Sequence, residues 1–180
     1  CVNDDYYGCN YYAFASTSFP TFKSGFIDDS SSSSTIGSYV RYGIGISPTS
    51  VLYDSTNELY IYMDSTTSYS LLAAMDFTAK DITVPAKFND VPVTVIRSKA
   101  FYGLYTQNIT ISAGIQKIQG YAFDNLGLKT VIIPSSVTTI NAYGFDSVCN
   151  KFYIGASAKP SEWDSYWAGS SSSSVNAVYG

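Results

Sequence analysis

Apolar residues recur at a fixed step between Val95 and Phe145, the step that separates Ile96 from Ile118. Each recurrence carries an isoleucine, then a small residue and a phenylalanine four and five positions later. Repeats of about 20–50 residues are typical of stacked coils, in which each unit buries its apolar face against its neighbours. The pattern therefore predicts a solenoid. The repeated positions are Ile96, Ile118 and Ile140; Ala100, Ala122 and Gly144; and Phe101, Phe123 and Phe145.

A short run rich in β-branched residues precedes each of these motifs, and a similar run at 152–154 follows the last one. Each run ahead of a motif predicts a strand whose first and third side chains face the core, because side chains alternate along a strand. Strands at the same phase in successive coils stack in parallel, about 4.8 Å apart. The second positions of these runs then form an outward column, which the step of the repeat continues from Ile132 to Ile154. We place in it Thr83, Thr110, Ile132 and Ile154.

The pattern I-x-x-x-A-F, followed by leucine and then by V-x-I-P-x-x-V-x-x-I, resembles the BspA-type leucine-rich repeat of bacterial and protist surface proteins. Residues 123–145 match it almost continuously, with Gly144 in place of alanine, while Ser112 stands where the motif has proline. The first unit is longer by five residues, around 87–91. The resemblance implies a β-rich solenoid, a short leucine-rich-repeat array of 22-residue coils with parallel strands.

Three regions are expected along the chain: a Tyr/Ser-rich β-region at 1–77 acting as an N-terminal cap, about three repeats at 78–155, and a C-terminal cap at 156–180. Caps are needed because the ends of a solenoid are exposed sheet edges and apolar coils. The last region is similar to the Trp-containing segment that often ends such arrays. Trp163 and Trp167 lie four residues apart, so a short helix would place both on one face over the open end. Stacking on carbohydrate is the alternative role for these two rings.

The N-terminal region contains runs of alternating apolar residues that predict strands. A turn is expected at 55–57, between two of these runs. The segment 68–77 is compatible with either a helical turn or a strand. The predicted strands are 38–46, 51–53 and 58–63.

Composition excludes several classes of function. Only 13% of the residues are charged, the net charge is −4 and the pI is about 4.5. Nucleic-acid binding requires a basic surface, so it is not expected. No apolar run reaches the length of about 18 residues that a membrane-spanning helix needs. Low charge with many Ser, Thr, Tyr and Asn residues is compatible with a secreted or cell-surface protein.

The sequence contains no arrangement that predicts catalysis. It has no histidine, which removes the Ser-His-Asp and Cys-His nucleophile systems and the commonest metal ligand. Asp124 and Asp146 recur at the step of the repeat, and we interpret them as solvated turn residues after each phenylalanine. We therefore expect a protein that is not an enzyme and needs no cofactor or metal. The alternative is a carbohydrate-binding module or glycoside hydrolase fragment that uses the Tyr/Asp-rich N-terminal region.

Three cysteines cannot all pair within one chain. Two interpretations of Cys1 stay open: a disulfide with Cys9, or lipid attachment, since a processed bacterial lipoprotein begins at a cysteine. Cys149 is expected to be a small buried apolar residue. Asn108 begins an N-x-T sequon, which makes it either a glycosylation site or a turn residue ahead of a strand.

What remains for function is the surface that the strands display. Besides the outward column, a row of mostly basic residues precedes the predicted strands and is a candidate docking site for an acidic partner. Lysine is also the usual protection of a sheet edge, so the row has a second interpretation. We expect an extracellular structural or adhesive protein that acts through protein–protein contacts. Its partner is either another copy, in a surface polymer, or a protein of other cells or matrix. The row consists of Lys80, Gln107, Lys129 and Lys151.

Overall fold

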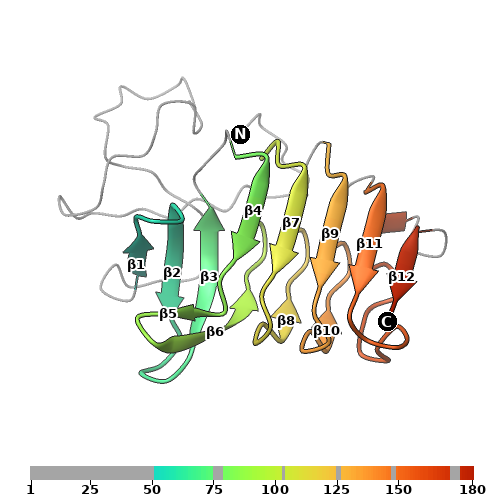
Figure 1. Cartoon of the computed structure of the whole chain (residues 1–180). Coiled ribbons are helices and arrows are strands. Elements are labelled where there is room, and N and C mark those ends of the chain that lie inside the picture. The colour runs from blue at the N-terminus through green and yellow to red at the C-terminus, as the bar shows by residue number, and fades with distance from the viewer. Residues whose placement is uncertain (1–50, 75–78, 103, 125–126, 147–148, 171–174) are drawn as a thin grey trace, which may run out of the picture.

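The structure is a computed structural model that describes residues 51–74, 79–102, 104–124, 127–146, 149–170 and 175–180. Within these ranges the chain forms a β-solenoid of about 4 turns, with no α-helix among the described elements. Two sheets form its walls, and successive turns lie side by side along the molecule (Figure 1). The predicted solenoid with parallel strands is confirmed.

The five-stranded sheet contains one strand from each turn plus a last strand at its end, in the order β12-β11-β9-β7-β4. All its neighbours are parallel, as expected for strands at the same phase of successive coils. Pro85 and Pro134 directly follow β4 and β9 and have no N–H with which to continue a ladder; the β7–β9 ladder ends at the pair Thr110–Ile132, one pair earlier than the β4–β7 ladder. The strands are β4 (Asp81–Val84), β7 (Asn108–Ile111), β9 (Thr130–Ile133), β11 (Lys151–Ile154) and β12 (Ala177–Tyr179).

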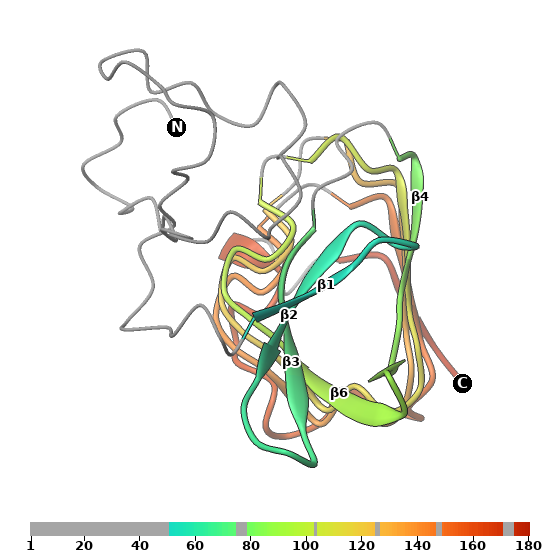
Figure 2. The ribbon, with the colours of Figure 1, turned by 90° about the vertical axis from the view of Figure 1, so that its left-hand side faces the viewer.

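The seven-stranded sheet joins the lead-in strands to the repeats. Strands β1, β2 and β3 are antiparallel neighbours, and β3 then pairs in parallel with β6, the first repeat strand of this sheet. Figure 2 shows β1 and β2 in front of the coils, at the end of the solenoid that faces the viewer. The strands are β1 (Val51–Asp54), β2 (Leu59–Met63), β3 (Tyr69–Ala74), β5 (Lys87–Phe88), β6 (Val91–Ile96), β8 (Lys117–Ile118) and β10 (Thr139–Ile140).

The strands predicted at 51–53 and 58–63 are present as β1 and β2, with a turn between them. The segment 68–77, which was compatible with helix or strand, forms strand β3 over its described part. The strand predicted at 38–46 lies outside the described residues. The side chains of β2 and β3 belong to the same buried cluster as the repeats, so this lead-in closes one end of the core.

The five-residue extension of the first unit forms a β-hairpin between β5 and β6, in which Phe88 pairs with Val91. Its two central residues, Asn89 and Asp90, have positive φ angles of 49° and 63°. Left-handed backbone at both positions is the requirement of a type I′ turn, and Asn and Asp tolerate it better than most residues. The extension is therefore accommodated outside the coil and leaves the phase of the next repeat unchanged.

The core is a single cluster that runs the length of the solenoid. Its centre is a stack of phenylalanine rings: the centroids of Phe101 and Phe123 are 4.7 Å apart, as are those of Phe123 and Phe145. The predicted inward positions of the strands are confirmed, with Ile82 half-buried at the first turn. Buried at 0–2% exposure are Val84, Ile109, Ile111, Val131 and Ile133.

The corner of each coil after β6, β8 and β10 has an unusual backbone. Lys99, Tyr121 and Tyr143 occupy equivalent positions and have φ angles of 59°, 58° and 57°. The small residue that follows each of them packs tightly against the coil. At Gly144 an added Cβ would lie 2.5 Å from Cγ2 of Ile140, so alanine does not fit there without movement. This crowding explains why glycine replaces the alanine of the motif.

The strand step shortens by one position at the last turn. The ladder pairs Lys151 with Thr130 and Ile154 with Ile133, so β11 begins one residue earlier than strict repetition predicts. A one-residue shift moves every side chain of a strand to the opposite face. The prediction that Ile154 faces outward is therefore wrong: Ile154 is 3% exposed, and Tyr153 takes the outward position at 41%.

The C-terminal tryptophans close the other end of the core. Trp163 and Trp167 are 2% and 1% exposed, and their ring centroids are 4.9 Å apart. The expected short helix is absent: residues 161–168 are mainly turns, and Trp163 forms an isolated parallel bridge with Ile140. Because both rings are buried, carbohydrate stacking on them is not compatible with this arrangement.

Candidate interaction surface

The outer face of the five-stranded sheet carries two parallel rows of side chains, which follow from the register of its strands. The polar row consists of the first residues of four strands. The second row, two residues further along each strand, begins as threonine and ends as apolar side chains. The polar row is Asp81, Asn108, Thr130 and Lys151, and the second row is Thr83, Thr110, Ile132, Tyr153 and Val178.

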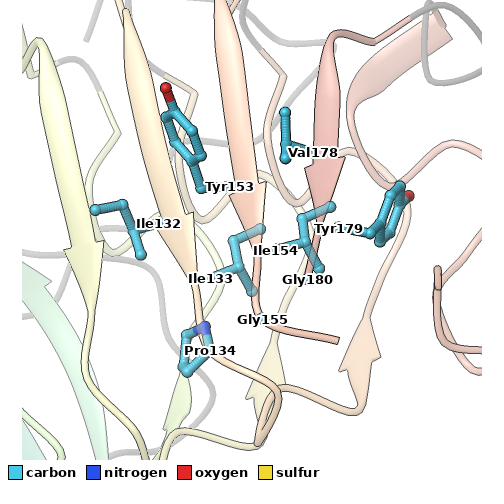
Figure 3. Close-up of a pocket in the computed structure, with 9 residues that line it drawn as sticks. All are labelled: Ile132, Ile133, Pro134, Tyr153, Ile154, Gly155, Val178, Tyr179 and Gly180. Carbon is cyan, nitrogen blue, oxygen red and sulfur yellow. The ribbon is translucent and has the colours of Figure 1, made fainter. Parts of the chain in front are cut away.

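The apolar end of the second row, which we call the apolar patch, consists of Ile132, Tyr153 and Val178. These side chains are 44%, 41% and 44% exposed and lie on the adjacent strands β9, β11 and β12. They line a shallow hollow of about 310 Å³, and Figure 3 shows the three side chains on their neighbouring strands. Single exposed apolar residues are common on proteins, whereas adjacent ones on a flat sheet are typical of contact sites.

The predicted outward column lies partly on this surface. Thr83 and Thr110 occupy the threonine end of the second row, and Ile132 belongs to the apolar patch. Ile154 lies inside, for the reason given above. Tyr153 and Val178 were missed. Tyr153 lies in a strand that is apolar on both faces, where alternation gives no signal.

The row of basic residues is shorter than predicted. Lys80, Gln107 and Lys129 each precede their strand by one residue, and the Lys129 Nζ donates a hydrogen bond to the Gln107 Oε1 at 3.0 Å. Lys151 does not continue this row, because the shortened step makes it the first residue of β11. Its Nζ instead lies 4.9 Å from the ring centroid of Tyr153, so it borders the apolar patch.

A tyrosine ladder runs along the corners of the coils. The ring centroids of Tyr121 and Tyr143 are 5.3 Å apart with planes at 1°, and those of Tyr143 and Tyr166 are 6.1 Å apart at 6°. The ring faces are turned toward one another, which leaves edges and hydroxyls for other contacts. The step of the repeat separates Tyr121 from Tyr143, so the sequence pattern contains this pair. Tyr166 comes one position later than that step predicts, so strict repetition does not find it.

Comparison with known proteins identifies the family. The family model described as BspA type leucine-rich repeat region (6 copies) matches residues 78–173, more than half of the chain. The chain belongs to the BspA-type leucine-rich repeat family. A leucine-rich repeat protein from Bacteroides capillosus ATCC 29799, known from a crystal structure, is similar in fold, with a TM-score of 0.54 and 19% identity over 72% of this chain and 99% of that one. No curated protein matches the sequence.

The acidic residues that follow the phenylalanines of these leucine-rich repeats are half-buried. Burial raises the pKa of the Asp124 and Asp146 carboxyls, and the Asp146 carboxylate raises the pKa of Asp124 further. No group of three His, Cys, Asp or Glu residues suited to a metal ion occurs within the described residues. The Asp124 and Asp146 carboxyls are thus less solvated than the exposed turn residues that we expected, and they do not belong to a group of three ligands suited to a metal ion.

The remaining predicted sites divide between the surface and the undescribed part of the chain. Asn108 begins strand β7 and is not a turn residue; its Nδ2 donates a hydrogen bond to the Asp81 Oδ1 at 2.6 Å. Cys1 and Cys9 lie outside the described residues. Cys149 is only half-buried, with its Sγ 3.4 Å from the Lys151 carbonyl oxygen, and burial raises the pKa of its thiol. Within the described ranges, no helix is long and apolar enough to span a membrane.

Proposed function

We propose that this chain is a non-enzymatic extracellular structural or adhesive protein whose outer sheet face makes its protein–protein contacts. Leucine-rich repeat solenoids are scaffolds that hold an extended surface toward a partner. The observation that supports a contact here is the apolar patch, in which three neighbouring strands expose an isoleucine, a tyrosine and a valine. The family is commonly found in secreted or surface proteins of bacteria, which supports the extracellular assignment.

The chemistry of the face fits a protein partner. A flat apolar centre containing an aromatic ring, bordered by polar groups, is the usual composition of a protein interface. Here the polar row borders the apolar patch, with Lys151 beside Tyr153 and Asn108 beside the Thr83–Thr110 end. Thr83, Thr110, Ile132, Lys80, Lys129 and Lys151 are proposed as contact or border residues on this basis.

Serine substitutions in the apolar patch test the proposal. Ile132→Ser and Tyr153→Ser remove an apolar contact from an exposed strand position and leave the core intact. Tyr105→Ser is the matched control, because Tyr105 is 66% exposed in the loop before β7 and lies outside the patch. We expect each patch variant to weaken the partner contact by about tenfold or more, the range of an interface hot spot, and the control to leave it unchanged.

Two measurements cover the two kinds of partner. Self-assembly is measured by sedimentation velocity over a series of protein concentrations. Adhesion is measured by the binding of labelled protein to intact bacterial cells and to a panel of immobilised extracellular-matrix proteins. If both patch variants self-associate and adhere as the wild type does, the outer face is not the contact surface and the proposal is wrong.

A further inference from the structure

Strand β12 leaves one side of its backbone open. The Phe152 N–H donates to the Asn176 carbonyl at 2.8 Å, and the Gly180 N–H donates to the Ile154 carbonyl at 3.1 Å. Backbone groups alternate between the two sides of a strand, so Asn176, Val178 and Gly180 face β11. Ala177 and Tyr179 therefore turn their N–H and C=O groups to the other side. Among the residues that the structure describes, no strand pairs with that side.

The two edges of the five-stranded sheet differ in how they are protected. At the β4 edge, Lys80 and Asp81 are exposed charges, and Pro85 follows the strand. Charges and proline are the usual means by which proteins prevent an edge from pairing with another chain. Residues 175–180 contain neither. The β12 edge is thus open to pairing, in contrast to the β4 edge of the same sheet.

The geometry points to a second copy of this chain as the occupant of this edge, with the two β12 strands paired antiparallel about a two-fold axis. Such a contact places each residue near its own equivalent, so any charge close to the axis would meet a like charge. Residues 175–180 carry no charged side chain, which is what a self-pairing edge requires. The same edge on β4 would bring Asp81 and Lys80 of each copy into the contact.

The side chains of β12 complement one another in this arrangement. Ala177 of one copy lies opposite Tyr179 of the second copy, and each of these two pairs exchanges both backbone hydrogen bonds. The small alanine leaves room for the ring of Tyr179, which is 36% exposed at its inward position. On the outer face the two Val178 side chains meet at the axis as a non-hydrogen-bonded pair, where cross-strand contacts are closest.

The pairing would also join the two apolar patches. The rows Ile132–Tyr153–Val178 of both copies would meet end to end through Val178 and form one continuous apolar strip on a wider sheet. This inference rests on the proposed function, because the edge-paired dimer would present the outer faces of two copies, with their joined apolar strip, to any further partner. It goes beyond that function by naming the edge and its symmetry.

A proline substitution tests the backbone contact. Ala177→Pro removes an N–H that points away from β11, so the internal ladder keeps its bonds, and proline is tolerated at such an edge position. The dimer would lose one hydrogen bond from each copy and gain a ring at the contact, which predicts dimerisation weaker by about tenfold or more. Ala177→Ser keeps the N–H and is expected to dimerise like the wild type. Sedimentation equilibrium of the three proteins gives the comparison.

A second variant, Val178→Lys, keeps the inference testable if the proline variant does not fold. Val178→Lys adds a charge at a 44% exposed position, where it faces its own copy across the axis, and it is expected to abolish the dimer while circular dichroism stays unchanged. In the wild type, the Ala177 and Tyr179 amides should exchange more slowly with solvent as protein concentration rises. The inference would be overturned by a wild type that stays monomeric at all concentrations, or by Ala177→Pro and Val178→Lys proteins that dimerise as the wild type does.

The outcomes separate this inference from the proposed function. Tyr153→Ser changes the apolar patch but not the edge, so it should still form the edge-paired dimer while its patch contact to cells, to matrix or between dimers is weakened. Ala177→Pro changes the edge but not the patch. Loss of adhesion in Tyr153→Ser with no dimer in any protein would refute the edge pairing and leave the proposed function standing.

Discussion

At the scale of single residues, Asp146 is a side chain whose surroundings disfavour its charged form. Its carboxyl is half-buried, and an added Cβ on Gly169 would lie 3.0 Å from its Oδ1, which shows how closely the last turn covers it. Burial disfavours the charged form and raises the pKa of the carboxyl. A raised pKa in the folded state means that folding favours the protonated acid.

We expect Asp146→Asn to stabilise the protein at neutral pH and not in acid. The contribution of a group with a raised folded-state pKa is fully present below its unfolded pKa of about 4 and is lost as pH rises through the folded pKa. At pH 7 the wild type thus carries the cost of a partly desolvated carboxylate, which asparagine lacks. Urea unfolding at neutral and acidic pH gives the measurement, with the exposed Asp90→Asn as control. A gain that is equal at both pH values would contradict the explanation.

At the scale of elements, the repeated corner of the coil determines how the repeats stack. Its left-handed residue turns the chain so that the N–H two residues later reaches the following coil: the Phe101 N–H donates to the Ala122 carbonyl at 2.8 Å and the Phe123 N–H to the Gly144 carbonyl at 2.9 Å. Left-handed backbone costs roughly 1–2 kcal/mol for a residue with a side chain. The solenoid has three such residues, one at each corner: Lys99, Tyr121 and Tyr143.

The ranking of two Tyr143 variants tests this strain. Both Tyr143→Gly and Tyr143→Ala remove the stacked ring, so that loss cancels between them. Glycine adopts the left-handed conformation freely, and we expect Tyr143→Gly to be the more stable by about 1 kcal/mol. At Tyr105, which is not among the positive-φ residues, the order should reverse in favour of alanine by about 0.5 kcal/mol. The measurement is urea unfolding of the four variants; alanine above glycine at both sites would rule out corner strain.

At the scale of the whole molecule, stability depends on how the ends of a short array are closed. The fourth turn ends in Trp167, whose ring centroid lies 4.9 Å from that of Phe152 and 6.1 Å from that of Phe145. The Phe145 N–H donates to the Trp167 carbonyl at 3.0 Å, so Trp167 occupies the row of the small residues Ala122 and Gly144. A large ring at a small-residue position covers the last phenylalanine instead of admitting another coil.

Removal of this ring is expected to destabilise the entire solenoid. Trp167→Ala should lower the free energy of unfolding by about 3–5 kcal/mol, because the ring is buried against Phe145 and Phe152 and its loss leaves a cavity. The adjacent Tyr166→Ala is the control: its ring is 52% exposed, and a loss of about 1 kcal/mol or less is expected. Urea unfolding of both variants gives the comparison, and equal losses would mean that Trp167 does not close the core.

Much of the repeat region could be predicted because its pattern depends on local chemistry. The columns of Ile96 and Phe101 recur in phase, and β-branched runs alternate inward and outward. The outer face was predicted where the alternation is clear, as at Thr83 and Ile132. Prediction failed in the last turn, since Phe152, Tyr153 and Ile154 are all apolar and fit either phase of a strand.

The sequence by itself determined that the chain stacks repeated coils, which apolar columns point inward, and that catalytic histidine is absent. Only the tertiary structure decided the phase of the final turn, because the shortened step is set by hydrogen bonds from β11 to β9 and not by β11 itself. The same shift placed Tyr153 beside Ile132 and Val178. The apolar patch is therefore a product of coil packing, and the repeat alone does not contain it.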